Sequence, residues 1–333
     1  MSIPKITVLM PVYNGEKYLR EAIESILNQS YANFEFLIID DASVDKSAEV
    51  IKSFGDSRIR YLRNDQNLGL IGTLNRGLVV AKGEYIARMD QDDISLPERF
   101  AKQVAFLDRC PDVGVLGTAV QMIDSGGTLI DSALVFPDSP NCIEWSMYFF
   151  CPIAHPTVLM RKDVAMKVGG YSAVAVHAED YDFWVRLSKV TRFSNLVETL
   201  LKLRKHETNM TKVFYSENLT AADRTAQALA AEHLEVPYAE YGNLFGDRKG
   251  PIKNPVLNAT MIFNLCSKMM KRRVPSSAEK KFIKKDAGRR LFSIFLNNRM
   301  SARDRLKILG LILLVDPFGA VQYGFRWLGR RVI

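Results

Sequence analysis

The chain has 333 residues and a mass of 37.6 kDa, of which 47% are hydrophobic and 25% charged, enough for roughly two domains of about 100–200 residues each. This composition excludes a disordered or collagen-like chain, and no apolar run reaches the ~20 residues of a membrane-spanning helix. The net charge is +8, and the four cysteines lack the spacing of a disulfide framework or a zinc site: Cys110, Cys142, Cys151 and Cys266.

The first 110 residues alternate short apolar runs with amphipathic segments. The apolar runs predict strands at Ile6–Met10, Phe34–Ile39, Ile59–Leu62 and Tyr85–Met89. Pro11 is expected to end the first strand, and Ser43 to cap one of the helices predicted between the strands. Strands that alternate with helices pair in parallel through right-handed crossovers. The sequence therefore predicts an α/β fold with a doubly wound, mixed but mostly parallel sheet flanked by helices.

Beyond Val113 the pattern is less regular. It predicts a helix at Glu179–Lys189, a hairpin turn at 125–127, and strand segments at 113–118, 119–124, 128–130, 145–150, 157–160 and 200–203. From about Glu217 onward only helical patterns remain. We predict a first domain of residues 1–215, divided into halves of 1–110 and 111–215, and then a helical, basic C-terminal region of residues 216–333.

The positive charge is concentrated at the C-terminal end of the chain. Residues 1–200 carry 20 Lys and Arg against 26 Asp and Glu, whereas residues 248–333 carry 20 against 4. Basic residues there stand beside large apolar ones, as at Lys281-Phe282 and Arg290-Leu291. This combination is typical of a helix on an anionic membrane surface, and a solvated basic face without a partner is the alternative. No specific nucleic-acid partner is expected, because no recognition motif is present.

Polar and acidic residues follow three of the predicted strands. Pro11-Val12-Tyr13-Asn14 follows the first, Asp40-Asp41 the second and Asp90-Gln91-Asp92-Asp93 the fourth. Ligands of open parallel sheets bind at the carboxyl ends of the strands. Carboxylates gathered there repel one another unless a divalent cation is present, and oxygen ligands suit Mg²⁺ or Mn²⁺ whose shell is completed by substrate phosphates. The expected ligand is a metal-bound diphosphate, and no G-x-G-x-x-G or P-loop pattern supports a dinucleotide oxidoreductase or a P-loop NTPase.

These segments resemble glycosyltransferase family 2. The resemblance covers roughly residues 3–210 and rests on three motifs in order: PVYN at 11–14, FEFLIIDDASVD at 34–45 and GEYIARMDQDD at 83–93. It implies a GT-A type fold, a nucleoside-diphosphate-sugar donor with UDP as the expected nucleotide, a divalent metal (Mn²⁺ or Mg²⁺) and inversion at the anomeric carbon. Residues 1–110 would then bind the nucleotide, and residues 111–215 would face the acceptor.

The resemblance also implies which residues bind the donor. Asp41 would accept a hydrogen bond from a base N–H, and the nucleotide-binding residues implied are Pro11, Tyr13, Asn14, Asp41, Asn67, Gly69 and Asp90. Asp90-Gln91-Asp92 matches the D-x-D motif, and the metal ligands implied are Asp92, Asp93 and His206. Some family members place a basic residue near Gly69 to meet the diphosphate, and here Arg63 or Arg76 is the candidate.

A further acidic segment, HAEDYDFWVR at 177–186, resembles the part of the family that carries the general base. It implies that Asp180 takes the proton of the acceptor hydroxyl, which is a poor nucleophile until that proton leaves. The alternative is an acidic residue favoured at the N-terminal end of a helix. His155, Glu179 and Arg204 match positions near the acceptor or the diphosphate, although a lone histidine is more often structural.

The predicted function is an inverting glycosyltransferase that moves a hexose or hexosamine from a nucleotide sugar to a hydroxyl of a saccharide or lipid-linked saccharide, in cell-surface polysaccharide biosynthesis. A metal-dependent nucleotidyltransferase is one alternative, although the chain lacks an early basic, glycine-rich loop for a triphosphate. A non-catalytic module that binds a nucleotide sugar or a polyanion is the other. Gln322 and Arg326-Trp327 miss the Q-x-x-R-W spacing of processive synthases by one residue, which favours single transfers.

The sequence also suggests a location. The N-terminus lacks a basic segment followed by an apolar stretch and a small-residue cleavage site, so no secretory signal is expected. Scattered cysteines fit a reducing compartment. We expect a cytoplasmic protein that is peripheral on the inner face of the plasma membrane through its C-terminal region.

Overall fold

The computed structural model describes residues 3–235, 254–272, 274–297 and 300–321. They form two compact units: the first contains residues up to 140 together with 151–222, and the second contains 141–150 together with the described residues after 222. The units divide within helix α9 (Tyr215–Leu234), and the functional boundary at residue 215 stays a prediction. The prediction of single transfers concerns residues that lie outside the described part of the chain: Gln322, Arg326 and Trp327.

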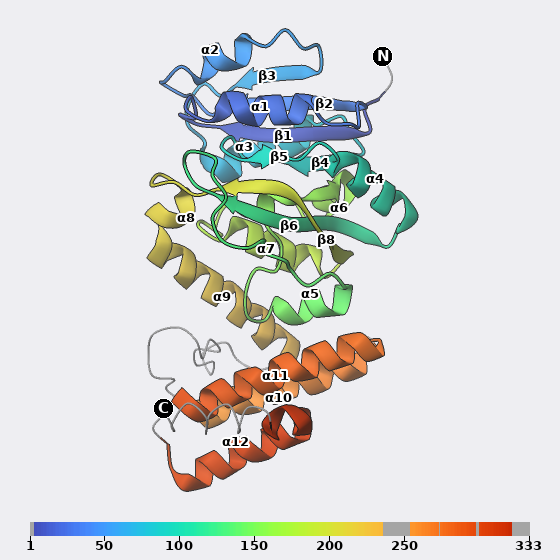
Figure 1. Cartoon of the computed structure of the whole chain (residues 1–333), viewed down its shortest axis with the longest axis vertical. Coiled ribbons are helices and arrows are strands. Elements are labelled where there is room, and N and C mark those ends of the chain that lie inside the picture. The colour runs from blue at the N-terminus through green and yellow to red at the C-terminus, as the bar shows by residue number, and fades with distance from the viewer. Residues whose placement is uncertain (1–2, 236–253, 273, 298–299, 322–333) are drawn as a thin grey trace. The chain divides into compact units, whose positions relative to one another are not determined.

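A mixed sheet forms the centre of the first unit (Figure 1). Its eight strands lie in the order β3-β2-β1-β4-β7-β6-β8-β5. They are β1 (Ile6–Val12), β2 (Phe34–Asp40), β3 (Ile59–Arg63), β4 (Tyr85–Arg88), β5 (Ile94–Ser95), β6 (Val113–Ile123), β7 (Leu159–Arg161) and β8 (Arg192–Arg204). β1, β2, β3 and β4 pair in parallel, as do β6 and β8, whereas β7 is antiparallel to β4 and β6 and β5 is antiparallel to β8. The predicted α/β class with a mostly parallel mixed sheet is confirmed.

Helices connect these strands and bury their apolar faces against the sheet. In α1, Leu19, Ala22, Ile23 and Ile26 recur at helical spacing, are fully buried and share a core with β1 residues such as Val8. The other connecting helices are α2 (Ser47–Lys52), α3 (Gly69–Val80), α4 (Arg99–Arg109), α5 (Pro140–Ser146), the 3-10 helix η1 (His155–Thr157), α6 (Lys162–Lys167), α7 (Glu179–Leu187) and α8 (Met210–Val213).

Two local predictions in the first half were wrong. Pro11 does not end the first strand, because β1 continues to Val12 opposite Asp40, while its pairing with β4 ends at Leu9. Pro11 lies beyond the end of the β4 ladder, where a missing N–H costs no pairing to β4. Ser43 is not a helix cap either: α2 begins at Ser47, and the Ser43 Oγ accepts a hydrogen bond from the backbone N–H of Asn14 at 3.0 Å.

The second half of the sheet is more regular than its sequence pattern. The strands predicted at 113–118 and 119–124 are one strand, β6, and the segment at 200–203 is the end of the longer β8. The edge piece predicted at 157–160 is the inner strand β7. The strand predicted at 145–150 was wrong, because Trp145 lies in helix α5, and a short buried apolar run does not distinguish the two states.

Gly83, at the entry to β4, occupies a position with no room for a side chain. A Cβ there would lie 2.3 Å from the backbone nitrogen of Thr7 and 2.5 Å from the carbonyl carbon of Ile6, neither of which can move without disturbing β1. We expect Gly83→Ala to lower the free energy of unfolding by about 3 kcal/mol, the upper end of overpacking costs. Gly55→Ala is the control, since nothing lies within 4 Å of its Cβ position. Equal unfolding midpoints in urea for the two variants would contradict this account.

The second unit is built around three mutually packed helices. They are α10 (Pro255–Arg272), α11 (Ser277–Asn297) and α12 (Ala302–Val315). Their buried core includes Ile262, Leu265, Met269, Ile283, Leu291, Ile294, Ile308 and Ile312. Leu291, which the sequence suggested for a membrane-facing helix, therefore packs inside the unit. Among the described residues, no helix is both long enough and apolar enough to cross a membrane.

The segment 141–150 belongs to this helical unit. Trp145 Nε1 donates to Asp286 Oδ2 at 2.9 Å, Asn141 Nδ2 donates to Glu279 Oε2 at 3.0 Å, and the guanidinium of Arg290 lies 3.8 Å from the ring centroid of Phe149. Burial alone would raise the pKa of Asp286, but the charge of Arg290 and the hydrogen bonds from Arg290 and Trp145 hold it below its usual value. Asp286 is therefore the centre of a satisfied polar network.

Candidate active site

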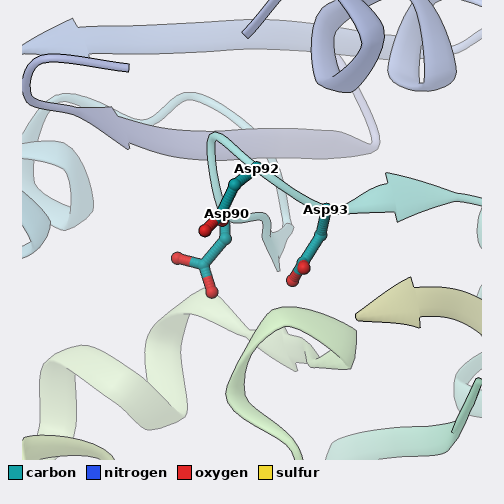
Figure 2. A group of neighbouring side chains, drawn as sticks. All are labelled: Asp90, Asp92 and Asp93. Atoms are coloured by element: carbon teal, nitrogen blue, oxygen red, sulfur yellow. The ribbon is translucent and has the colours of Figure 1, made fainter. Parts of the chain in front are cut away.

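Three carboxylates meet in the loop between β4 and β5. Side-chain oxygens of Asp90, Asp92 and Asp93 lie within 4.8 Å of one another, and Figure 2 shows all three on this loop. Burial and the negative charges of Asp90 and Asp92 raise the pKa of Asp93 well above its usual value. Carboxylate oxygens that all carry negative charge repel one another, and a divalent cation bound between them would offset this repulsion. The chemistry of this donor set therefore suits Mn²⁺ or Mg²⁺.

Arg204, at the end of β8, holds the acidic loop in place. Its backbone N–H donates to Asp93 Oδ1 at 2.9 Å, and its Nε donates to the carbonyl oxygen of Asp92 at 2.9 Å. Its guanidinium pairs with Glu21 and lies 4.6 Å from the ring centroid of Tyr18, and the side chain is only 2% exposed. The sequence placed Arg204 beside the acceptor or diphosphate. That placement stays a prediction, and the structure adds that Arg204 positions the acidic loop through these bonds.

His206 lies beside Asp92, as a metal-ligand role requires. Its Nε2 is 2.8 Å from Asp92 Oδ2, and its Nδ1 is 2.9 Å from Thr208 Oγ1. The Asn209 Nδ2 donates to the same Asp92 oxygen at 3.1 Å. Burial and the charge of Asp90 raise the pKa of Asp92, against the opposing effect of His206. Sequence reasoning missed Asn209, because an uncharged residue three positions after His206 gives no signal until the loop is folded.

A buried arginine next to the acidic loop was also missed. Arg88 ends β4, is 3% exposed and forms an ion pair with Asp90, while its Nε has no hydrogen-bond partner among the described residues. Its positive charge lowers the pKa values of carboxyls in both acidic segments: Asp92, Asp93, Glu179 and Asp180. Arg88 therefore connects the two segments electrostatically. The available signal was a lone arginine in an otherwise apolar strand, two residues before Asp90.

Asp41, directly after β2, meets the turn that precedes α3. Its Oδ1 accepts from Asn64 Nδ2 at 2.6 Å and from the backbone N–H of Leu68 at 2.8 Å. No hydrogen bond to its Oδ2 is found among the described residues, which leaves that oxygen for a ligand N–H. In the same turn the Asn67 Oδ1 accepts from the backbone N–H of Gly69 at 2.9 Å, and Gly69 has a φ of +72°, which favours glycine. The fold thus brings three predicted nucleotide-site residues together.

The turn after β1 is tied to the acidic loop. The backbone N–H of Tyr13 donates to Gln91 Oε1 at 2.9 Å, and Gln91 Nε2 donates to the carbonyl oxygen of Tyr13 at 3.1 Å. Asn14 has a φ of +48°, and its Oδ1 accepts from the backbone N–H of Val44 at 2.9 Å. A Cβ on Gly15 would lie 2.4 Å from Gln91 Oε1, so a larger residue there would displace the Gln91 side chain from its bonds to Tyr13. Tyr13 is 48% exposed.

Three other residues proposed for the nucleotide site are held by contacts within the fold. The Arg63 Nη1 donates to the buried Asp40 at 2.7 Å, and the Arg76 Nη1 donates to the carbonyl oxygen of Arg63 at 2.9 Å. These bonds stabilise the loops after β2 and β3, and a diphosphate contact by either arginine stays a prediction. Pro11 is buried within β1 and shapes the strand end instead.

The second acidic segment begins helix α7. The Asp180 Oδ1 accepts from the backbone N–H of Tyr181 at 2.6 Å, and the thiol of Cys151, another residue that sequence reasoning missed, lies 3.9 Å from Asp180 Oδ2. Burial raises the pKa of Asp180. Burial and the charge of Asp180 raise the pKa of Glu179 to about 7, and the charge of Asp90 adds to this effect. A carboxylate whose pKa is raised toward neutrality is a better proton acceptor than an ordinary one.

His155 is buried in η1. Its Nε2 is 2.7 Å from the Tyr171 hydroxyl, and its ring centroid is 5.7 Å from that of Trp184. Burial and the charge of Arg88 lower the pKa of His155 well below its usual value, so the ring is neutral. The sequence placed His155 on the acceptor side, but this environment favours a packing role.

Comparison with solved structures supports the fold. A crystal structure of S. aureus TarS in complex with UDP-GlcNAc matches with a TM-score of 0.57 at 18% identity, over 94% of this chain and 90% of that one. The mannosyltransferase PcManGT from Pyrobaculum calidifontis, in complex with GDP-Man and Mn²⁺, matches with a TM-score of 0.51 at 15% identity, over 98% and 88%. The fold is that of GT-A glycosyltransferases.

Comparison with known sequences gives the family. Residues 7–152 match the model for glycosyl transferase family 2. The chain is 33% identical over 282 residues to the Bacillus subtilis protein named "Putative glycosyltransferase EpsE", covering 83% of this chain and 96% of that protein. It is 34% identical over 212 residues to the O-antigen biosynthesis glycosyltransferase WbnJ of Escherichia coli, covering 62% and 82%. The chain belongs to glycosyltransferase family 2, as its motifs suggested.

Proposed function

We propose that this glycosyltransferase moves a hexose or hexosamine from a UDP-sugar to a hydroxyl of a saccharide or lipid-linked saccharide, with inversion at the anomeric carbon. The observation that carries the proposal is the pair of acidic segments, around Asp92 and Asp180, that share the charge of Arg88. The complex of TarS with UDP-GlcNAc supports the donor class. The relationship to WbnJ supports a role in cell-surface polysaccharide biosynthesis.

The donor is held by residues from three turns. The base stacks on Tyr13 and donates to the Oδ2 of Asp41, while Asn14, Asn67 and Gly69 shape the surrounding turns. Asp92, Asp93 and His206 would hold Mn²⁺ or Mg²⁺, with Asp90 beside them toward the ribose. When bound, the cation supplies positive charge that stabilises the leaving diphosphate. Arg204 and Asn209 keep the acidic loop in the geometry that this binding needs.

Asp180 performs the proton transfer. The acceptor oxygen attacks the anomeric carbon from the side opposite the diphosphate, the bond from that carbon to the diphosphate oxygen breaks, and its electron pair leaves with UDP. Asp180 takes the hydroxyl proton as the new bond forms. The adjacent Glu179 lies on the acceptor side, and the Cys151 thiol helps to orient the Asp180 carboxylate. Attack from one face in a single displacement gives the inverted product.

The proposal is tested by following both products of the reaction. The purified protein is first assayed for a UDP-induced rise in melting temperature, with Mn²⁺ and with a chelator. UDP-sugars are then incubated with saccharide acceptors, and the anomeric configuration of the product is read by NMR. We expect metal-dependent UDP binding, release of UDP and an inverted glycoside. Release of pyrophosphate from a nucleoside triphosphate would instead indicate a nucleotidyltransferase, and nucleotide binding without turnover on any acceptor would indicate a binding module.

The raised pKa of the proposed base predicts the pH dependence of the reaction. Burial raises the pKa of Asp180, so its protonated form persists to higher pH than that of an ordinary aspartate, and only the ionised form can take a proton. We expect kcat/KM for the free enzyme to rise with pH along a limb above the usual Asp value of 3.8. Glu179→Gln removes a neighbouring negative charge and should move this limb to lower pH. A limb that falls as pH rises through this range would contradict the assignment.

The same proposal includes the organisation of the chain. Residues 1–110 bind the nucleotide, residues 111–215 face the acceptor, and residues 216–333 bring the enzyme to an anionic membrane surface, on the cytoplasmic face of the plasma membrane. The concentration of basic residues after position 248 supports the membrane partner. A lipid-linked acceptor would then be presented to the enzyme at that surface.

A further inference from the structure

Helix α12 carries two apolar faces instead of one. Ile308, Ile312 and Val315 are buried in the helical unit. On the other side, Leu306 is 69% exposed, Leu313 is 48% exposed and Leu314 is 70% exposed. A surface helix normally presents polar residues opposite its buried stripe. The exposed side of α12 therefore lacks the polar character that water alone would favour.

These exposed leucines share one side of the helix. At 3.6 residues per turn, Leu313 lies almost directly above Leu306 after two turns, and Leu309 and Leu314 flank that line. All four are among the exposed large apolar residues of the chain, and Phe318 and Val321 continue the exposed apolar surface beyond the helix. We call Leu306, Leu309, Leu313 and Leu314 the α12 apolar face. A contiguous apolar patch of this kind marks an interaction surface.

Cations border the α12 apolar face. Arg303 and Lys307 are exposed and lie at the edge of the same side of the helix. On α11, Lys280, Lys281 and Lys284 are exposed, whereas Ile283 and Leu291 are fully buried and Phe282 is 39% exposed. The larger exposed apolar surface therefore lies on α12, which has four exposed leucines. Long basic side chains can reach upward from such a face to anionic headgroups.

We propose that the α12 apolar face inserts into the interfacial layer of an anionic lipid bilayer. Residues 248–333 carry 20 Lys and Arg against 4 Asp and Glu, so the region is attracted to anionic lipid, whereas a second copy of it would bring the same excess of positive charge. Nucleic acid would meet the cations but leave the leucines in water. A bilayer offers both an anionic surface and an apolar layer below it.

The inference names the surface that makes the proposed membrane contact, and it depends on neither the donor nor the base assignment. Its test is flotation of the full-length protein with phosphatidylcholine vesicles, with and without phosphatidylglycerol. The test variant combines Leu306→Gln, Leu313→Gln and Leu314→Gln. The matched control combines Leu129→Gln and Leu134→Gln, two leucines of the first unit that are 61% and 49% exposed.

We expect the wild type and the control to float with anionic vesicles only, less tightly as salt is raised. We expect the test variant to bind about 100-fold more weakly, since each of the three exposed leucines contributes about a factor of five. Circular dichroism and the melting temperature of the variant should stay unchanged, because the replaced side chains point to solvent. Hydrolysis of the UDP-sugar without vesicles should also be retained. Absence of that hydrolysis in the wild type would overturn the donor proposal without touching the vesicle result.

Three outcomes would overturn the inference. One is equal binding of the test variant and the wild type to anionic vesicles. Another is binding of the wild type to phosphatidylcholine vesicles that is as tight as binding to anionic ones. The third is a wild type that ignores vesicles but forms a concentration-dependent dimer in sedimentation, which the test variant does not form. In that case the α12 apolar face would be a self-association surface.

Discussion

Asp180→Asn should lower the rate of sugar transfer by about 10²–10⁴-fold, the range that a positioned general base contributes. The amide keeps the shape of the carboxylate and still accepts the hydrogen bond from the backbone N–H of Tyr181, but it cannot take a proton. Binding of the proposed UDP-sugar donor should change little, because the role proposed for Asp180 is toward the acceptor. Single-turnover transfer rates and donor affinity by calorimetry together measure this separation.

Asp182→Asn is the matched control for this prediction. Asp182 lies in the first turn of the same helix, but its carboxylate pairs with Arg186 at 2.8 Å. We expect its transfer rate to stay within a few-fold of the wild type, at a stability cost of about 0.3–0.5 kcal/mol for a helical ion pair. An Asp180→Asn enzyme that transferred sugar at the wild-type rate would show that another group is the base.

Asp92→Asn should weaken metal-dependent UDP binding by at least about 100-fold. Removing a residue that only supports a metal ligand typically costs 10–100-fold, and Asp92 is the proposed ligand itself. The asparagine retains one oxygen but loses the negative charge that a divalent cation requires. The measurement is UDP affinity by calorimetry at fixed Mn²⁺, with the chelator-treated wild type as the reference for metal-independent binding.

The control here is Asp112→Asn, which removes an exposed carboxylate that pairs with Arg192 at 3.2 Å outside the acidic loop. We expect it to bind UDP and Mn²⁺ as the wild type does. Asp92→Asn should also stay folded, since His206 and Asn209 can bond to an amide oxygen. If Asp92→Asn kept a wild-type response to Mn²⁺, the metal would have to be held elsewhere.

The acidic loop could be predicted from the sequence because its position depends only on residues next to it in the chain. Four polar residues after a short apolar strand can only emerge at the strand end, and the order of parallel strands brings that end to the ligand side of the sheet. The same reasoning located Asp41 after β2 and Tyr13 after β1. The structure adds the bonds of Gln91 to Tyr13, which join two of these turns into one surface.

The role of Arg204 could not be predicted, because it depends on where other segments fold. A basic residue near a predicted diphosphate is an obvious candidate partner, yet its guanidinium is already used by Glu21 of α1 and by the carbonyl oxygen of Asp92. Arg88 was missed because its sequence position did not suggest a functional role. An inward-pointing arginine on a buried strand is unfavourable by pattern alone, and only the surrounding carboxylates of the folded site explain it.

The C-terminal region shows that amino-acid composition alone does not predict which apolar residues are exposed. Its basic and apolar content suggested a membrane helix, but content cannot say which apolar residues pack on neighbouring helices. In α11, Ile283 and Leu291 are buried in the core and Phe282 is 39% exposed, whereas α12 has apolar residues on both a buried and an exposed side. Similarly, the apolar run at 145–150, which was predicted as a strand, packs against helices of the second unit.

The membership of residues 141–150 in the helical unit limits how this enzyme can be recombined with its relatives. A chimera that exchanged only the part of the chain after α9 would pack Trp145 and Phe149 against helices whose side chains do not match them. Exchange would have to carry the ten-residue segment along with its partners Glu279, Asp286 and Arg290. The sequence of segment 141–150 and that of the C-terminal helices are therefore constrained together.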